Sequence, residues 1–202
     1  MGGLPFLPEG TEHPDCASCR APLTLLVQLD VAQLPNPQRH GGEGLLQLFH
    51  CMASPVCEDG WRPFARCHLG RRVPKAPGAR SAVATAVQFP RWSVQRWVPV
   101  DDYPDEEDLE DTFGRPLDEA ARAELEAVRA TYPRAGDKLG GWPLWVQGPE
   151  RPPCPRCGRT MEVLFQIESD ELIPYTWGDL GIGHWTQCPA HPDVMTYSWA
   201  CT

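Results

Sequence analysis

The sequence predicts a mainly β, α+β fold made of two similar β-rich halves, with one clear helix between them and a zinc knuckle in each half. The main observation is a Cys-x-x-Cys element that occurs twice, at Cys16–Cys19 and Cys154–Cys157, each time followed by the same kind of apolar strand. The two copies match without a gap from the cysteines to Gln28 and Gln166. We interpret this as an internal duplication whose halves pack as one unit, because neither half alone has much core. The 23 prolines and 18 glycines favour many short strands joined by turns.

The first half covers about residues 2–67 and begins with a Gly-Gly-x-Pro motif. Thr24–Asp30 is short and mostly aliphatic, which predicts a buried strand. Leu34–Pro37 and His40–Gly44 have the composition of turns. Leu45–Cys51 predicts a second strand, which carries Cys51 at its end.

The second half covers about residues 138–202 and repeats this order. A second Gly-Gly-x-Pro motif begins at Gly140. Met161–Ile167 matches the first strand, and Gly181–Cys188 matches the second strand with Cys188 at its end. We therefore expect residues 1–202 to form a single domain.

Residues 82–131 link the two halves. Ala82–Val100 is rich in Val, Trp and Phe and predicts one or two further strands, and Asp101–Asp111 is expected to be an acidic loop. Leu117–Thr131 predicts the one clear helix, because apolar residues recur in it at helical spacing and Pro116 precedes it. Pro133 and Gly136 are expected to end it.

Charge is distributed unevenly along the chain. The net charge is −9, and the excess of acidic residues lies between Asp101 and Glu126. The preceding region, Gly60–Pro99, contains several arginines and no acidic residue. A basic surface beside an acidic segment can bind partners, but a solvated face is the simpler interpretation.

Composition also indicates the cellular setting. No apolar stretch approaches the ~20 residues that a membrane helix needs, and the N-terminal residues lack the features of a secretion signal. Nine cysteines without an export signal argue for reduced thiols, and therefore for metal binding rather than disulfides. We expect a cytoplasmic protein that does not contact membranes.

The first half contains a complete set of zinc ligands. A Cys-x-x-Cys knuckle places two thiolates on one tight turn, and a structural tetrahedral site needs two more ligands. Cys51 and Cys57 can supply them, so the expected set is Cys16, Cys19, Cys51 and Cys57. Cys67 is left over; with His68 it offers an alternative ligand, but we interpret it as a small buried apolar residue.

The second half provides Cys154, Cys157 and Cys188, and it has no cysteine at the position that matches Cys57. We favour His191 as the fourth ligand, because it follows Cys188 over a short turn. Cys201 is the main alternative, and His184 is a more distant one.

Two other interpretations of the cysteines are redox catalysis and inert buried thiols. A thioredoxin-type Cys-x-x-Cys opens a helix, whereas each pair here precedes a predicted strand. Four protein ligands at each site would leave no open position, so we expect two structural zinc ions rather than a catalytic one. The sequence has no phosphate-binding glycine loop, nucleophile elbow or HExxH motif. The tryptophans of the second half are expected in the core, a ligand-stacking platform being the alternative.

Several of these motifs resemble those of a known family. Pro22–Asp30, Gly44–Phe49, Asp137–Gln147 and Trp177–Gly181 resemble the YwqG-like bacterial domain of unknown function, over nearly the whole chain. The resemblance implies an α+β fold built by duplication, without an established activity. Because several members lack the cysteines, metal binding rests on this sequence alone.

The cysteine-bearing form is also similar to the programmed cell death protein two family of eukaryotes, which has a Gly-Gly-x-Pro motif, a Cys-x-x-Cys pair and later cysteines in the same order. That similarity implies a chaperone role toward a newly made ribosomal protein. The MYND-type zinc finger of that family is absent from this sequence.

These observations favour a non-enzymatic, zinc-stabilised, cytoplasmic protein-interaction module, chaperone-like toward a basic client that would suit Asp101–Glu126. An immunity protein that neutralises a toxin is the alternative, and a zinc-dependent hydrolase is a third function from a different class. We expect a monomer that binds a protein partner rather than nucleic acid.

Overall fold

The computed structural model describes residues 1–53, 57–129 and 135–202. Its strands are β1 (Phe6–Pro8), β2 (Thr24–Asp30), β3 (Leu45–His50), β4 (His68–Val73), β5 (Gly78–Arg80), β6 (Lys138–Leu139), β7 (Glu162–Glu168), β8 (Ile182–Gln187) and β9 (Met195–Ala200). The helices are α1 (Glu106–Phe113) and α2 (Glu119–Arg129), with short 3₁₀ helices η1 (Val31–Gln33) and η2 (Pro37–His40). The protein is therefore mainly β, as predicted.

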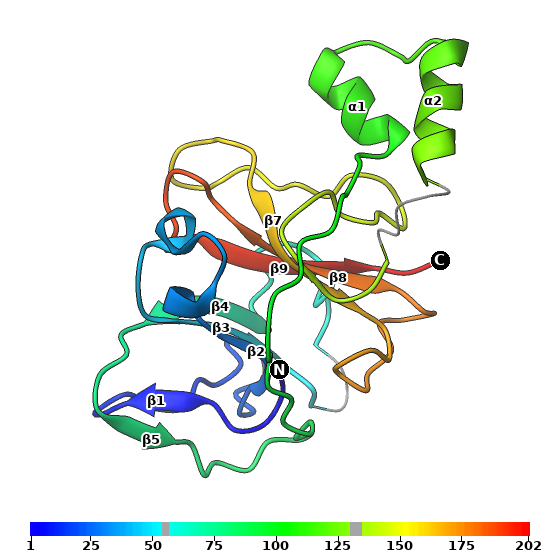
Figure 1. Ribbon diagram of the computed structural model, residues 1–202. Coiled ribbons are helices and arrows are strands. Elements are labelled where there is room, and N and C mark those ends of the chain that lie inside the picture. The colour runs from blue at the N-terminus through cyan, green and yellow to red at the C-terminus, as the bar shows by residue number, and fades with distance from the viewer. Residues whose placement is uncertain (54–56, 130–134) are drawn as a thin grey trace.

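Two antiparallel sheets form the body of the molecule (Figure 1). The first has the order β2-β3-β4 and the second the order β6-β7-β8-β9, while β1 and β5 form a separate pair. The pairing shifts between Leu25 and Val27 on β2, and between Val163 and Phe165 on β7. Edge strands β4 and β9 pack against each other and so bring the two sheets together.

A single large core lies between the sheets. It contains Leu26 and Leu48 from the first sheet and Leu164, Trp185 and Tyr197 from the second, all at most 2% exposed. Gly70 on β4 permits this close approach, because a Cβ atom there would lie 2.8 Å from Nε1 of Trp185. Each sheet thus buries the apolar side chains on the inner face of the other.

The two halves make matching contacts at positions 138 residues apart. The amide of Gly2 donates to the carbonyl of Leu26 (2.8 Å), as that of Gly140 does to Leu164 (2.9 Å). The amide of Phe6 donates to Oε1 of Gln28 (2.9 Å), as that of Leu144 does to Oε1 of Gln166 (2.8 Å). The same local structure therefore precedes β2 and β7.

The linking segment differs from the prediction in two places. Ala82–Val100 contains no strand: its backbone contacts are isolated, for example from Gly3 to Phe89 (3.0 Å), and Pro90 lacks an amide hydrogen, so no ladder forms. Part of the expected acidic loop is helix α1, because the carboxylate of Asp105 accepts the amide of Asp108 (2.9 Å) at its start.

Helix α2 lies within the predicted range. The predicted end of this helix, at Thr131 and Pro133, lies outside the described residues. Across the described part of the chain, no helix has the length and apolar character needed to cross a membrane.

Candidate metal centres

The first centre joins a turn before β2 to the end of β3. The turn that carries Cys16 and Cys19 is closed by two backbone bonds, from the amide of Cys16 to Ala21 (2.8 Å) and from the amide of Arg20 to Cys16 (2.9 Å). Arg20 adopts a left-handed conformation there, with φ of 67°. Cys51 follows β3 directly, so the strand positions its thiol opposite the turn.

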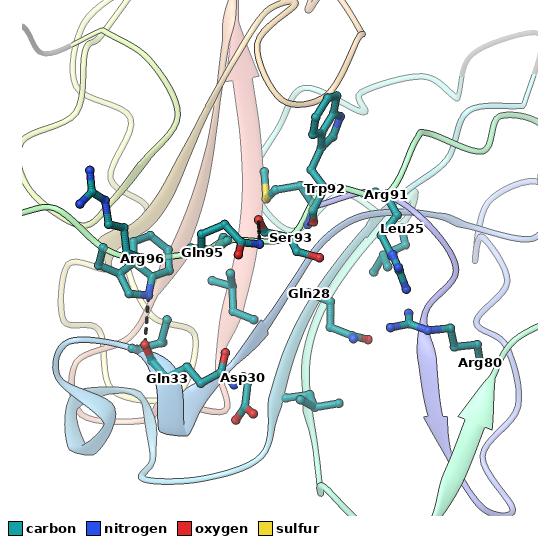
Figure 2. Close-up of a pocket in the computed structure, with 17 residues that line it drawn as sticks. Leu25, Gln28, Asp30, Gln33, Arg80, Arg91, Trp92, Ser93, Gln95 and Arg96 are labelled. Atoms are coloured by element: carbon teal, nitrogen blue, oxygen red, sulfur yellow. Dashed lines mark hydrogen bonds between the residues drawn. The ribbon is translucent and has the colours of Figure 1, made fainter.

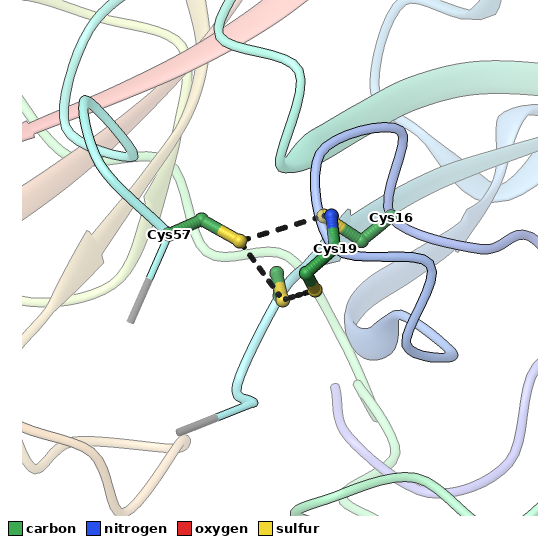
Figure 3. A group of neighbouring side chains, drawn as sticks. Cys16, Cys19 and Cys57 are labelled. Atoms are coloured by element: carbon green, nitrogen blue, oxygen red, sulfur yellow. Dashed lines mark hydrogen bonds between the residues drawn. The ribbon is translucent and has the colours of Figure 1, made fainter. Parts of the chain in front are cut away.

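The four sulfur atoms of this centre form a compact group (Figure 3). Their separations are 3.6 Å for Cys16–Cys57, 3.5 Å for Cys19–Cys51 and 3.7 Å for Cys51–Cys57. A disulfide would require about 2.05 Å. A tetrahedral zinc ion with Zn–S bonds of about 2.3 Å requires sulfur atoms roughly 3.8 Å apart. The donor set therefore fits a single tetrahedral ion.

The second centre has the same construction. The turn that carries Cys154 and Cys157 is closed from the amide of Cys154 to Arg159 (2.7 Å) and from that of Gly158 to Cys154 (2.8 Å), and Gly158 has φ of 72°. Cys188 follows β8 as Cys51 follows β3.

The fourth donor of the second centre is the imidazole of His191. Its Nδ1 lies 3.7 Å from the sulfur of Cys188 and 4.0 Å from that of Cys154, while the sulfurs of Cys157 and Cys188 are 3.7 Å apart. In both centres all four donor atoms lie within 4.8 Å of one another. One cluster of four cysteines, and one of three cysteines with a histidine, could therefore each hold a metal ion.

Local hydrogen bonds and burial give the thiols unequal acidities. The amide of Ala21 lowers the pKa of Cys19 to about 7, whereas burial raises the pKa of Cys51 to about 11. Burial also raises the pKa of Cys154, but the amides of Arg156 and Cys157 and neighbouring thiols outweigh it and bring that pKa to about 6. Metal binding would thus release protons from the thiols that are still protonated.

The other candidate ligands lie outside both clusters. Cys67 is fully buried, and its carbonyl accepts the amide of Cys51 (2.8 Å). Cys201 lies against Gly178, and His184 packs on Trp145 with ring centres 4.5 Å apart. All nine cysteines fall in the described residues and all are free thiols.

One buried ion pair, which positions α1, was not predicted from the sequence. Asp108, expected in a solvated loop, is fully buried; its carboxylate pairs with Arg151 and accepts a hydrogen bond from Nε1 of Trp145 (3.1 Å). Burial raises the pKa of Asp108, although the charge of Arg151 opposes this. The spacing of Asp105 and Asp108 is a helix-start signal that could have revealed the helix, but not the burial.

Comparison with known proteins gives a family match over most of the chain. A family model described as "Domain of unknown function (DUF1963)" matches residues 1–189. A curated relative, the uncharacterized protein YpfL of Salmonella typhimurium, is 34% identical over 76 residues, which is 38% of this chain. The match spans only 18% of that relative's length.

Proposed function

The chain belongs to the DUF1963 family, and on that premise we propose that it is a non-enzymatic, zinc-stabilised protein-interaction module of the cytoplasm. We assign it to the YwqG-like form of this domain, with the cysteines as an addition. The observation that carries the interaction role is an acidic pair of helices that projects from the two-sheet body (Figure 1).

Zinc is the ion that best suits both donor sets. Thiolate and imidazole donors in a tetrahedral arrangement favour Zn²⁺ over magnesium or calcium, which prefer oxygen. Four protein donors leave no open position for a substrate or an activated water, which argues against hydrolysis. A bound ion would cross-link each Cys-x-x-Cys turn to the end of a central strand, β3 or β8, and so contribute to folding.

We further propose that the two halves arose by duplication. The matching contacts at Gly2 and Gly140, the equivalent pairing shifts on β2 and β7, and the equivalent construction of the two centres support this.

The projecting helices present mainly acidic side chains to solvent. The residues concerned are Glu106, Glu107, Glu110, Asp111, Glu119, Glu124 and Glu126, all partly or largely exposed. Arg122 on α2 pairs with Glu106 and with Glu110 (3.3 Å) on α1, and so joins the two helices. Such a surface would attract a basic client protein by charge complementarity.

The metal part of this proposal is tested by Cys16→Ser and Cys154→Ser. Each variant should retain about one zinc ion instead of two and unfold at lower temperature, since each removes one ligand of a separate centre. Full metal content and an unchanged melting temperature in both variants would contradict the structural-zinc proposal.

The interaction part is tested by charge reversal on α2. Partners recovered with the purified wild-type protein from host extract should be lost from Glu119→Lys/Glu124→Lys. They should be kept by the matched control Glu9→Lys/Glu12→Lys, which reverses two exposed acids elsewhere. Equal recovery by both variants would rule out the acidic helices as the binding surface.

A further inference from the structure

Strands β7 and β2 correspond to each other in the two sheets, but only β7 has a strand paired with its outer edge in the described residues. In the second sheet, β6 pairs antiparallel with β7, with Lys138 opposite Gln166. The first sheet begins at β2, and no strand within residues 1–53, 57–129 and 135–202 pairs with its outer edge. Gln28, the counterpart of Gln166, therefore has no partner strand on that side.

Backbone groups of β2 point toward this open edge. The amide of Val31 donates to Gly44 (3.0 Å), which directs the backbone groups of Val31 toward β3. Because these groups alternate in direction along a strand, those of Gln28 and Asp30 point away from β3. In the described residues, no hydrogen bond connects the backbone of Gln28 or Asp30 to the chain segment across from it. The amides of Gln28 and Asp30 and the carbonyl of Gln28 are thus available to an added strand, while the carbonyl of Asp30 lies at the start of η1.

A groove of about 630 Å³ lies along this edge (Figure 2). Its far wall is the segment Arg91–Trp97. This wall is fixed at both ends, by the amide of Trp92 donating to Met1 (2.9 Å) and by Nε1 of Trp97 donating to the carbonyl of Gln33 (3.0 Å). The volume is in the range of binding pockets, roughly 300–1,000 Å³.

The charge of the groove is positive. Arg80, Arg91 and Arg96 line it, and none of the three has a carboxylate partner in the described part of the chain. The acidic residue in the lining is Asp30, which is already paired with Lys75 (2.6 Å). Carboxylates of a ligand would therefore meet unpaired guanidinium groups there.

The amide side chain of Gln28 adds to this donor-rich surface. Its Oε1 accepts hydrogen bonds from the amide of Phe6 (2.9 Å) and from Nε2 of Gln47 (2.7 Å). These two bonds fix the side chain, and its NH₂ group remains as a donor near Arg80 and Arg91 (Figure 2).

We propose that an extended, acidic segment of a partner protein adds to the outer edge of β2 as a strand, beside Gln28 and Asp30, as Lys138 of β6 lies opposite Gln166 on β7. Backbone bonds to Gln28 and Asp30 would hold the segment, and its carboxylates would pair with Arg80, Arg91 and Arg96. A segment of about four residues covers this length of edge at roughly 3.3 Å per residue. This site is separate from the acidic helices, so the two interactions can be tested independently.

The test uses a fluorescein-labelled hexapeptide that alternates glutamate with valine, added to the full zinc-loaded chain. We expect binding that weakens with salt and that falls about tenfold in Arg91→Gln/Arg96→Gln, a loss of roughly 1.4 kcal/mol. Neither arginine makes a hydrogen bond in the described residues, so this variant should fold. Arg62→Gln/Arg115→Gln is the control with the same change in net charge, and its affinity should match the wild type.

Strand addition is separated from simple anion binding by two further measurements. The same peptide methylated on alternate backbone nitrogens keeps its charge but loses half of its strand donors, so it should bind at least about tenfold more weakly. Hydrogen exchange at the amides of Gln28 and Asp30 should slow with the acidic peptide and not with inorganic phosphate. Three results would each overturn the proposal. They are equal binding of the methylated peptide, displacement of the peptide by inorganic phosphate at a concentration equal to that of the peptide's carboxylates, and no binding of the peptide at all.

Discussion

In the second candidate metal centre, a histidine takes the position that a cysteine has in the first. His191 lies in a short loop after Cys188. The amide of Cys188 donating to Val194 (3.0 Å) closes this loop, and the amide of Val194 donates to the carbonyl of His191 (2.8 Å). Cys57 reaches the first cluster from a longer connection after Cys51. A neutral imidazole in place of a thiolate leaves the second site with one negative charge fewer, so the two sites would differ in charge while sharing one geometry.

This difference leads to a prediction for the second centre. We expect His191→Ala to lower the zinc content from about two ions to about one, because Nδ1 of His191 is one of the four donors. Cys201→Ser should keep both ions, because its sulfur lies against Gly178, outside the cluster. Metal analysis of the purified proteins decides between the two ligands, and a larger loss in Cys201→Ser would show that the cysteine is the ligand.

The sequence could predict which residues gather in the two clusters because the geometry of each cluster is mostly local. Two cysteines on one turn and a third at the end of a strand are fixed by short stretches of chain, and the sequence contains this arrangement twice. The role of Asp108 could not be predicted in this way. Its burial depends on Arg151 and Trp145, which are distant in sequence, and nothing near Asp108 distinguishes it from the exposed acids around it.

At the scale of single elements, strands with continuous apolar runs were predictable, whereas β4 and β9, which lack such runs, were not. Thr24–Asp30 is the observed β2 to the residue. Strand β4 contains Gly70 and two arginines, and β9 mixes polar and aromatic residues, so neither has the apolar run of a buried strand. They pair as strands because β3 and β8 each offer an open edge. Most residues of β9, and His68 and Val73 of β4, are then buried.

Helix α1 is attached to the body through Asp108, and this attachment can be tested. Asp108→Ala leaves Arg151 without its buried partner, so we expect a loss of about 2 kcal/mol in the local stability of α1. Proteolysis between residues 101 and 118 should become faster, while the zinc content stays unchanged. The exposed neighbour Asp111→Ala is the control, and equal protease sensitivity in both variants would show that the buried pair does not anchor the helix.

At the scale of the whole molecule, the two sheets depend on one shared core. The sequence predicted that the halves would pack together, since each had too few apolar residues to fold alone. It could not predict that β4 would meet β9, because that contact depends on shape: a Cβ atom at Gly70 on β4 would lie only 2.9 Å from Cβ of Met195 on β9. The fit in shape between two strands that are far apart in the sequence leaves no periodic pattern of residues, so it cannot be predicted from the sequence.

The stability of the whole molecule should also depend on pH through Asp137. Its carboxylate accepts the amides of Glu168 (2.8 Å) and Leu172 (3.3 Å), yet burial outweighs these bonds and raises the pKa of Asp137 to about 6. In the unfolded chain the pKa of an aspartate is about 3.9. The folded state therefore holds this proton more tightly, and the stabilisation is present below pH 4 and is lost as the pH rises through 6.

Asp137→Asn removes this titration. We expect the stability of the variant relative to the wild type to rise by about 1–2 kcal/mol between pH 4 and pH 7, a value reduced for partial solvent exposure. Urea unfolding at both pH values measures it, and comparing the two proteins at each pH cancels the loss of metal in acid, which affects both. A constant difference across this range would show that Asp137 has an ordinary pKa.

The shared core also determines when the protein can fold during its synthesis. Tyr197, which belongs to the same core as Leu26, is made about 170 residues later than Leu26. At about 5–20 residues per second, β2 waits roughly 10–30 s for β9. Cys16, Cys19, Cys51 and Cys57 have all been made before the first third of that interval ends, so a zinc ion captured there can hold β2 and β3 together on the nascent chain while their apolar faces still lack a partner.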